Sequence, residues 1–294
     1  MSSRRLILAT LLAAVAPLAP AAAVEPPLRV VASFSILADI ARNVGGDRVR
    51  VTSLVGPNAD AHVYDPRPSD VAAVANADVL LTNGLGFEGW MDRLVGASGF
   101  QGRWIVAAAD IAPRPADGHD DPHAWQDPRN VIRYVNRISA VLAATRPADA
   151  ATFAVNAERY RRELLALDAR IQRAVDSLPP ARRRFVTSHD AFGYFARRYG
   201  FTIFAPQGWS TDDQASARDV AALIDQLKAG RVRAVFVENI TDPRLIERIA
   251  AEGGATVGGR LYSDALAQHG EPAGTYLGMM RHNLETLLAA LRSP

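Results

Sequence analysis

The stretch PADAATFAVNAERYRRELLALDARIQRAVDSLPP, residues 147–180, decides the fold. Its apolar residues recur at spacings of 7, 4, 3, 4, 4 and 3, at Phe153, Tyr160, Leu164, Leu167, Ile171, Val175 and Leu178. Such spacings place side chains on one face of a helix, which Pro147 can begin and the Pro179-Pro180 pair ends. About 30 helical residues extend ~45 Å at 1.5 Å per residue. Because a crossover within one sheet needs less, we expect this helix to join two separate units.

Short apolar strands alternate with helices on both sides of this long helix. Before it we predict strands at 28–34, 49–55, 79–83 and 103–109, with helices at 35–45, at 69–77 with Ser69 as N-cap, and near 88–97. After it we predict strands at 184–189, 201–206, 234–239 and 255–262, with helices at 191–200 and 275–292. Strands that alternate with helices are typical of parallel sheets. The expected fold class is α/β: two parallel-sheet α/β lobes joined by one long rigid helix.

The N-terminus has the pattern of a secretory signal peptide. MSSRR is positively charged, LILATLLAAVAPLA is apolar, and small residues follow up to Ala23. The sequence contains no cysteine, so we expect neither a disulfide nor a lipid-anchoring cysteine at the cleavage site. We predict a periplasmic protein with a signal peptide at 1–23, an N-terminal lobe at 24–146, a linker helix at 147–179 and a C-terminal lobe at 180–294.

The composition narrows the class of protein further. Of the 294 residues, 49% are hydrophobic and 22% are charged, which suits globular cores and argues against disorder. The 33 basic and 31 acidic residues nearly cancel. Because no basic run is interleaved with aromatic residues, we expect no nucleic-acid partner.

Three of the six histidines occupy comparable positions. His62 follows the predicted strand 49–55, His189 comes at the end of the predicted strand 184–189, and His123 lies among the prolines and carboxylates of DPHAWQDP. Asp264 follows another strand. Ligands in open parallel sheets bind at the carboxyl ends of the strands, so we expect these four side chains to meet in the cleft between the lobes. Three imidazoles and one carboxylate would suit Zn²⁺.

Nearby carboxylates are candidates to support these imidazoles. Asp65, Asp121 and Asp127 are close enough in sequence to accept hydrogen bonds from imidazole N–H groups, and we expect Glu238 to orient a ligand or form a salt bridge. The separations of 61, 66 and 75 residues between the four candidates match no local metal motif. Ordinary loop and core histidines therefore remain the alternative on spacing alone. If the imidazoles do bind metal, affinity should fall as the pH drops through about 6.5.

The segment NGLGFEG, residues 83–89, has the letters of the dinucleotide fingerprint G-x-G-x-x-G, and Asp110 closes the next strand. Glu88 would place a carboxylate where a pyrophosphate binds at a helix N-terminus, and an exported chain rarely meets NAD. We therefore interpret the glycines as a tight turn.

Motifs throughout the mature chain resemble the periplasmic zinc/manganese-binding proteins of ABC importers, the cluster A-I or bacterial solute-binding protein 9 family. The matching segments are PNADAHVYDPRPSD (57–70), NGLGFEGWMDRL (83–94), DPHAWQDPRN (121–130), TSHDAFGYFARRYG (187–200), GWSTDDQASARDV (208–220), VFVEN (235–239), LYSDALAQHG (261–270) and TYLGMMRHN (275–283). The resemblance implies two α/β lobes, one rigid linking helix, and metal ligands at His62, His123, His189 and Asp264.

The resemblance also implies a function. We expect a monomer that captures a divalent metal ion and delivers it to an ABC permease, with a metallochaperone as an additional candidate partner. Manganese-selective members often carry Glu where this sequence has His189, so a third nitrogen favours Zn²⁺ over Mn²⁺ as cargo. Many zinc members carry a His-rich loop before the second ligand; here that loop offers only His119, and we expect no zinc-collecting role for it.

An alternative from another class is a secreted zinc hydrolase, in which a water molecule fills the fourth position on the metal. Asp264 discriminates between the two readings, because its coordination leaves no vertex for that water. The sequence contains no H-E-x-x-H and no G-x-S-x-G motif. We therefore expect a binding protein and not an enzyme.

Overall fold

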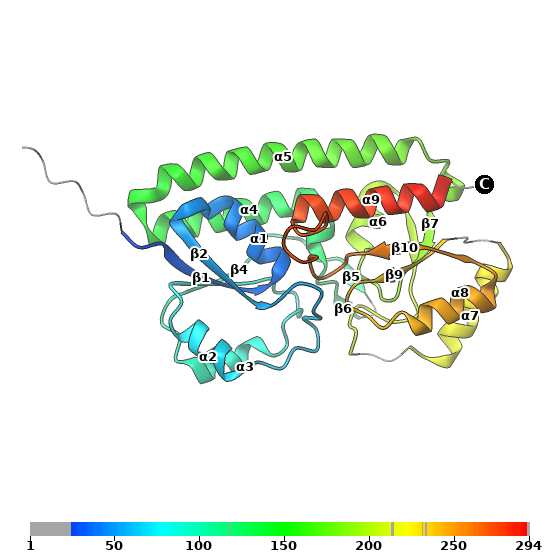
Figure 1. The fold of residues 1–294 in the computed structure, drawn as a ribbon, viewed down its shortest axis with the longest axis horizontal. Helices are drawn as coiled ribbons and strands as arrows, with labels where there is room; N and C mark the ends of the chain where they lie inside the picture. The colour runs from blue at the N-terminus through cyan, green and yellow to red at the C-terminus, as the bar shows by residue number, and fades with distance from the viewer. Residues whose placement is uncertain (1–24, 117, 213–214, 231, 233, 293–294) are drawn as a thin grey trace, which may run out of the picture.

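The computed structural model describes residues 25–116, 118–212, 215–230, 232 and 234–292. It contains two four-stranded sheets, one in each half of the molecule, and the strands of each sheet run parallel (Figure 1). The expected α/β fold with two parallel-sheet lobes is confirmed. The predicted signal peptide, residues 1–23, lies outside the described residues.

The first sheet has the order β2-β1-β3-β4, with β1 Leu28–Phe34, β2 Val49–Val55, β3 Val79–Thr82 and β4 Arg103–Val106. Its helices are α1 Ser35–Gly45, α2 Pro68–Ala75, α3 Met91–Ser98 and α4 Pro128–Thr145, and a short hairpin is formed by β5 Pro115–Ala116 and β6 His119–Asp120. The second sheet has the order β10-β9-β7-β8, with β7 Arg184–Val186, β8 Thr202–Phe204, β9 Ala234–Glu238 and β10 Thr256–Leu261. Its helices are α6 Gly193–Tyr199, α7 Ala217–Lys228, α8 Arg244–Gly253 and α9 Tyr276–Arg292.

The long helix is α5, Ala150–Asp176, which runs along both lobes (Figure 1). Its 27 residues extend ~40 Å. The apolar stripe predicted from the sequence is buried along its length, from Phe153 to Val175. This stripe packs on α1 and α4 in the first lobe and on α6 and α9 in the second. One continuous apolar face therefore joins the two lobes.

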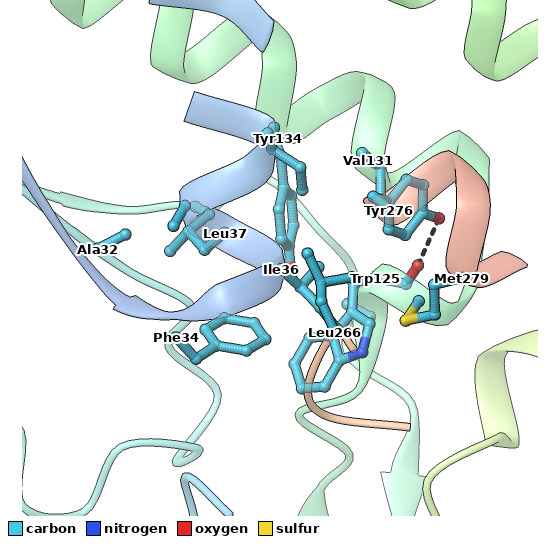
Figure 2. Close-up of a cluster of buried hydrophobic side chains, with 14 of the residues drawn as sticks. Ala32, Phe34, Ile36, Leu37, Trp125, Val131, Tyr134, Leu266, Tyr276 and Met279 are labelled. Carbon is cyan, nitrogen blue, oxygen red and sulfur yellow. Dashed lines mark hydrogen bonds between the residues drawn. The ribbon is translucent and has the colours of Figure 1, made fainter. Parts of the chain in front are cut away.

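The final helix, α9, extends this junction. Figure 2 shows side chains of β1, α1, α4 and α9 meeting in one buried cluster. The Tyr276 hydroxyl donates to the Trp125 carbonyl oxygen at 2.7 Å, and the Trp125 indole donates to the Ser263 carbonyl oxygen at 2.9 Å. The buried core of β1 is thus contiguous with that of β7 and β9, through Phe34, Phe185 and Phe236. Wide separation of the lobes would expose this core to water, which is unfavourable.

Several predicted boundaries were wrong, and the helices α4, α7 and α8 were given no bounds from the sequence. Ser69 is not the N-cap of α2: the helix begins at Pro68, and Asp70 accepts a hydrogen bond from the Arg67 amide at 2.7 Å. Proline suits the first helical position because its φ is already helical. The predicted strands 103–109 and 184–189 end early, at Val106 and Val186. The sequence analysis did not assign α4.

None of the helices in the described part of the chain is both long and apolar enough to cross a membrane.

Candidate metal centre

The four predicted site residues come from four separate connections. His62 lies between β2 and α2, His123 precedes the turn that leads into α4, His189 lies between β7 and α6, and Asp264 lies between β10 and α9. The structure brings all four together, with one nitrogen or oxygen of each lying within 4.8 Å of the others. First-lobe and second-lobe residues thus share one cluster, which is almost entirely buried.

The Asp264 carboxylate is at the centre of the cluster. Its Oδ2 atom lies 3.1 Å from the Nε2 atom of His189 and 3.2 Å from that of His62, and its Oδ1 atom lies 3.6 Å from the Nε2 atom of His123. The three imidazole ring centres are 5.3 to 5.7 Å apart. His123, His189 and Asp264 have no exposed surface. Three nitrogens and one carboxylate therefore converge in a space shielded from water.

Two of the imidazoles are held from behind by carboxylates. The Nδ1 atom of His123 lies 2.8 Å from Asp121 Oδ1, which also accepts from the His123 amide at 2.9 Å. The Nδ1 atom of His189 lies 2.8 Å from Glu238 Oε2, while Glu238 Oε1 accepts from the amides of Ser188 and His189. Such partners fix the ring orientation and raise the basicity of the opposite nitrogen. The Nε2 atoms are thereby directed toward Asp264.

His62 is held in a different way. Its backbone amide donates to Asp60 Oδ1 at 2.9 Å, and none of the described residues places a carboxylate behind its ring. Phe87 packs on the imidazole at 4.8 Å between ring centres, and Trp209 lies 6.1 Å away. His62 therefore has a backbone hydrogen bond and aromatic packing but, among the described residues, no carboxylate behind its ring.

The charges of the cluster shift its pKa values in opposite directions. Burial alone would lower the pKa of His123, but Asp264 and Asp121 outweigh it and raise that pKa to about 9. Burial would likewise lower the pKa of His189, but Glu238 and Asp264 raise it well above its usual value. At His62 the effect of burial is larger than the opposing effect of Asp264, so the pKa is lowered. Burial would raise the pKa of Asp264, yet His123 and His189 hold it well below its usual range.

The supporting carboxylates match the sequence analysis only in part. Asp121 and Glu238 support imidazoles as predicted, whereas Asp127 accepts from the Arg129 amide at 2.8 Å and caps α4. Asp65 contacts none of the imidazoles described here. The sequence analysis missed Asp60, although a signal was present: Asp60-Ala61-His62 and Asp121-Pro122-His123 share the pattern D-x-H. In both, an aspartate oxygen accepts from the amide of the histidine two residues later.

Among the other residues singled out from the sequence, Glu88 lies at the glycine-rich turn. Its Oε1 atom accepts from the Asn83 amide and the Ser33 hydroxyl, both at 2.6 Å, and its Oε2 atom accepts from the Gly84 amide at 3.1 Å. Gly84 has a φ of +86°, and a Cβ there would lie 2.3 Å from Val106. The loop amides that a pyrophosphate would need are therefore bound to the protein's own carboxylate. This favours the tight turn over a dinucleotide site.

Known proteins of similar sequence and structure are named for metal binding. The family model described as zinc-uptake complex component A, periplasmic, matches residues 30–290. The chain is 39% identical over 279 residues to the manganese-binding lipoprotein MntA of Bacillus subtilis, covering 91% of each. It is 36% identical over 282 residues to the zinc-binding protein TroA of Treponema pallidum, covering 92% of this chain and 91% of TroA.

Two solved structures have the same fold. The periplasmic zinc binding protein TroA of Treponema pallidum matches with a TM-score of 0.86 at 32% identity, covering 91% of this chain and 99% of TroA. The Mn-bound periplasmic metal binding protein of Candidatus Liberibacter asiaticus matches with a TM-score of 0.81 at 28% identity, covering 89% of this chain and 98% of that one.

Proposed function

Since this chain belongs to the family of periplasmic zinc-uptake components, the metal-binding proteins that serve ABC importers, we propose that it captures Zn²⁺ in the periplasm and delivers it to its permease. We propose His62, His123, His189 and Asp264 as the ligands. The supporting observation is the convergence of three imidazole Nε2 atoms on one buried carboxylate.

The hydrogen bonding of the cluster supports a bound ion. The Nε2 atoms of His62 and His123 and the Oδ1 atom of Asp264 are buried without a hydrogen-bond partner. Buried polar atoms are rarely left unsatisfied in folded proteins. A divalent cation coordinated by these atoms would satisfy all of them at once, and its charge would exceed that of the single carboxylate among the ligands.

The choice of zinc depends on the third imidazole nitrogen, which His189 provides. MntA is named for manganese and TroA for zinc, so similarity alone supports either cargo. Imidazole nitrogen favours Zn²⁺ over Mn²⁺, which prefers oxygen ligands, and the Irving–Williams order acts in the same direction. We therefore propose zinc, with manganese as the alternative cargo.

A hydrolase is the second candidate class. It would need Asp264 to point away from the histidines, so that a water molecule could occupy the fourth position on the metal. Asp264 Oδ2 instead lies within 3.2 Å of two imidazole nitrogens. We therefore propose a binding role with no catalytic step.

Metal competition tests this function. We expect protein stripped with EDTA to take up one equivalent of Zn²⁺ and to retain it against excess Mn²⁺. His189→Glu exchanges the third nitrogen for oxygen, so it should weaken zinc retention more than manganese retention. Metal content after desalting measures both. Preferential retention of manganese by the wild type would make manganese the cargo, and the absence of any stoichiometric metal would contradict the function.

The pKa shifts predict proton release. Before an ion binds, His123, with a pKa of about 9, and His189, with a raised pKa, carry protons at pH 7. A metal binds only neutral imidazole, so we expect zinc uptake at pH 7 to release about two protons. The affinity for zinc should therefore rise with pH up to about 9. The sequence alone suggested that this change would occur near pH 6.5, the reference pKa of histidine. Calorimetry in two buffers of different ionisation enthalpy measures the release, and a value near zero would contradict these protonation states.

A further inference from the structure

One carboxylate connects the His62 loop to the opposite lobe. Asp60 Oδ1 accepts from the His62 amide at 2.9 Å, and Asp60 Oδ2 accepts from the Thr211 hydroxyl at 2.6 Å. Asp60 lies between β2 and α2 of the first lobe, and Thr211 lies between β8 and α7 of the second. The backbone position of one proposed ligand therefore depends on a side chain of the other lobe. We call the hydrogen bond between Asp60 and Thr211 the clasp.

Other contacts join the lobes around the centre, and some of them also link two side chains, as where the Asn239 side-chain amide donates to Asn58 Oδ1 at 3.1 Å and Arg114 donates to Asp190 Oδ2 at 2.9 Å. Two further contacts are of a firmer kind. The Asn58 amide donates to the Leu266 carbonyl oxygen, and the Trp125 indole donates to the Ser263 carbonyl oxygen, both at 2.9 Å. These bonds involve main-chain atoms beside a buried core that is continuous between the lobes. The clasp joins two side chains that are both partly exposed. It can therefore open without disturbing the core.

The two D-x-H segments differ at this point. In the first segment, Asp60 is held by the neutral hydroxyl of Thr211. In the second, Asp121 is fully buried, and its Oδ2 atom accepts from the Arg114 guanidinium at 2.7 Å. In the Asp121–Arg114 contact both partners are charged and attract each other, whereas in the clasp only the acceptor is a charged group, and a partly buried ion pair is little screened by salt. The segment that carries His62 is thus the more easily released of the two.

A cavity of about 600 Å³ adjoins the clasp. Asp60 and Thr211 line it, as do Ser188, next to His189, and Thr241. Its lining also includes the polar residues Gln207, Asp242 and Arg244, so the wall is suited to water molecules. The cavity therefore reaches both ligand-bearing segments and can hold an ion that still carries part of its hydration shell.

We propose that Asp60 is the positioning residue for His62, and that the clasp must open for the ion to pass between the metal centre and the adjoining cavity. This inference rests on the proposed function. The rate of ion exchange then depends on the clasp, a contact that involves none of the four ligand side chains. His62, behind whose ring no carboxylate of the described residues lies, is then the ligand that leaves first and binds last.

Stopped-flow kinetics tests this proposal. The full chain is loaded with Zn²⁺ and mixed with excess EDTA and a zinc indicator to give the dissociation rate, and the apo protein is mixed with Zn²⁺ to give the association rate. Thr211→Val removes the clasp but keeps the side-chain shape. We expect zinc dissociation to become about tenfold faster, the effect of losing one hydrogen bond to a charged acceptor, without slower association. Thr211→Ser should restore the wild-type rate.

Thr241→Val is the matched control, because it makes the same change in the same cavity where the hydroxyl has no partner. We expect its dissociation rate to stay within about twofold of wild type. Equal acceleration in Thr241→Val, or no acceleration in Thr211→Val while one zinc equivalent is still bound, would overturn the inference and leave the proposed function standing. Failure of the wild type itself to bind zinc would instead overturn the function.

Discussion

Asp264→Ala is expected to weaken zinc binding by far more than the roughly 10–100-fold that loss of an outer supporting group costs. Asp264 is the only anion among the proposed ligands, and all three imidazole Nε2 atoms face it. Without it a divalent ion would lie in a fully buried space with three neutral ligands and no direct counter-charge. Burying a charge without a partner is strongly unfavourable. Competition against a chelator of known zinc affinity measures the loss.

Substitutions of two other carboxylates, Asp127 and Glu238, serve as controls for this experiment. Asp127→Asn should leave affinity unchanged, because Asp127 caps α4 and asparagine caps a helix equally well. Glu238→Gln should fall between the two, within the 10–100-fold range, since Glu238 supports the His189 ring and amide but is not a proposed ligand. If Asp264→Ala binds zinc within tenfold of wild type, Asp264 is not a ligand. The fourth position would then be open to water, as a hydrolase requires.

The parts of the fold that the sequence predicted well are those with a strong local pattern. The long helix follows from one apolar stripe between prolines, and β1, α1 and β2 have the predicted bounds. The helix α4 had comparable signals, with Asp127 as N-cap, Pro128 at the first position, and buried Val131, Val135 and Ile138 at helical spacing. The local pattern for this helix is therefore present in the sequence, although the helix was not predicted.

The site was predictable to a similar degree, because parallel sheets collect ligands at the carboxyl ends of their strands. That rule places His62, His189 and Asp264 in one cleft from their positions after strands. It gives no information about side chains that meet across the lobes. The contact of Asp60 with Thr211 joins residues 151 positions apart, and no local pattern in the sequence encodes it.

Asp168→Ala is expected to lower the free energy of unfolding by about 3 kcal/mol, without changing zinc stoichiometry. Asp168 is buried on α5 and accepts from the Arg129 guanidinium of α4 at 2.8 Å, from Arg198 of α6 at 2.7 Å, and from the Tyr199 hydroxyl at 2.9 Å. Hydrogen bonds to a charged group contribute about 1.5–3 kcal/mol each. Both arginines are partly exposed and regain water when the carboxylate is removed, so the loss is smaller than the sum. Urea unfolding measures it.

The pH dependence of this loss separates charge from packing. Burial would raise the pKa of Asp168, but Arg198, Arg129 and Tyr199 outweigh it and hold that pKa below its usual value. A carboxylate whose pKa is lower in the folded state stabilises the protein above its unfolded pKa, about 3.9, and loses that contribution as the pH falls through its folded pKa. The difference between wild type and Asp168→Ala should therefore be full at pH 7 and shrink below about pH 4. Asp176→Ala removes an exposed carboxylate from the same helix and should change stability by less than about 0.5 kcal/mol. If the Asp168→Ala difference is the same at pH 7 and pH 3, packing of the side chain, and not its charge, joins α5 to the two lobes.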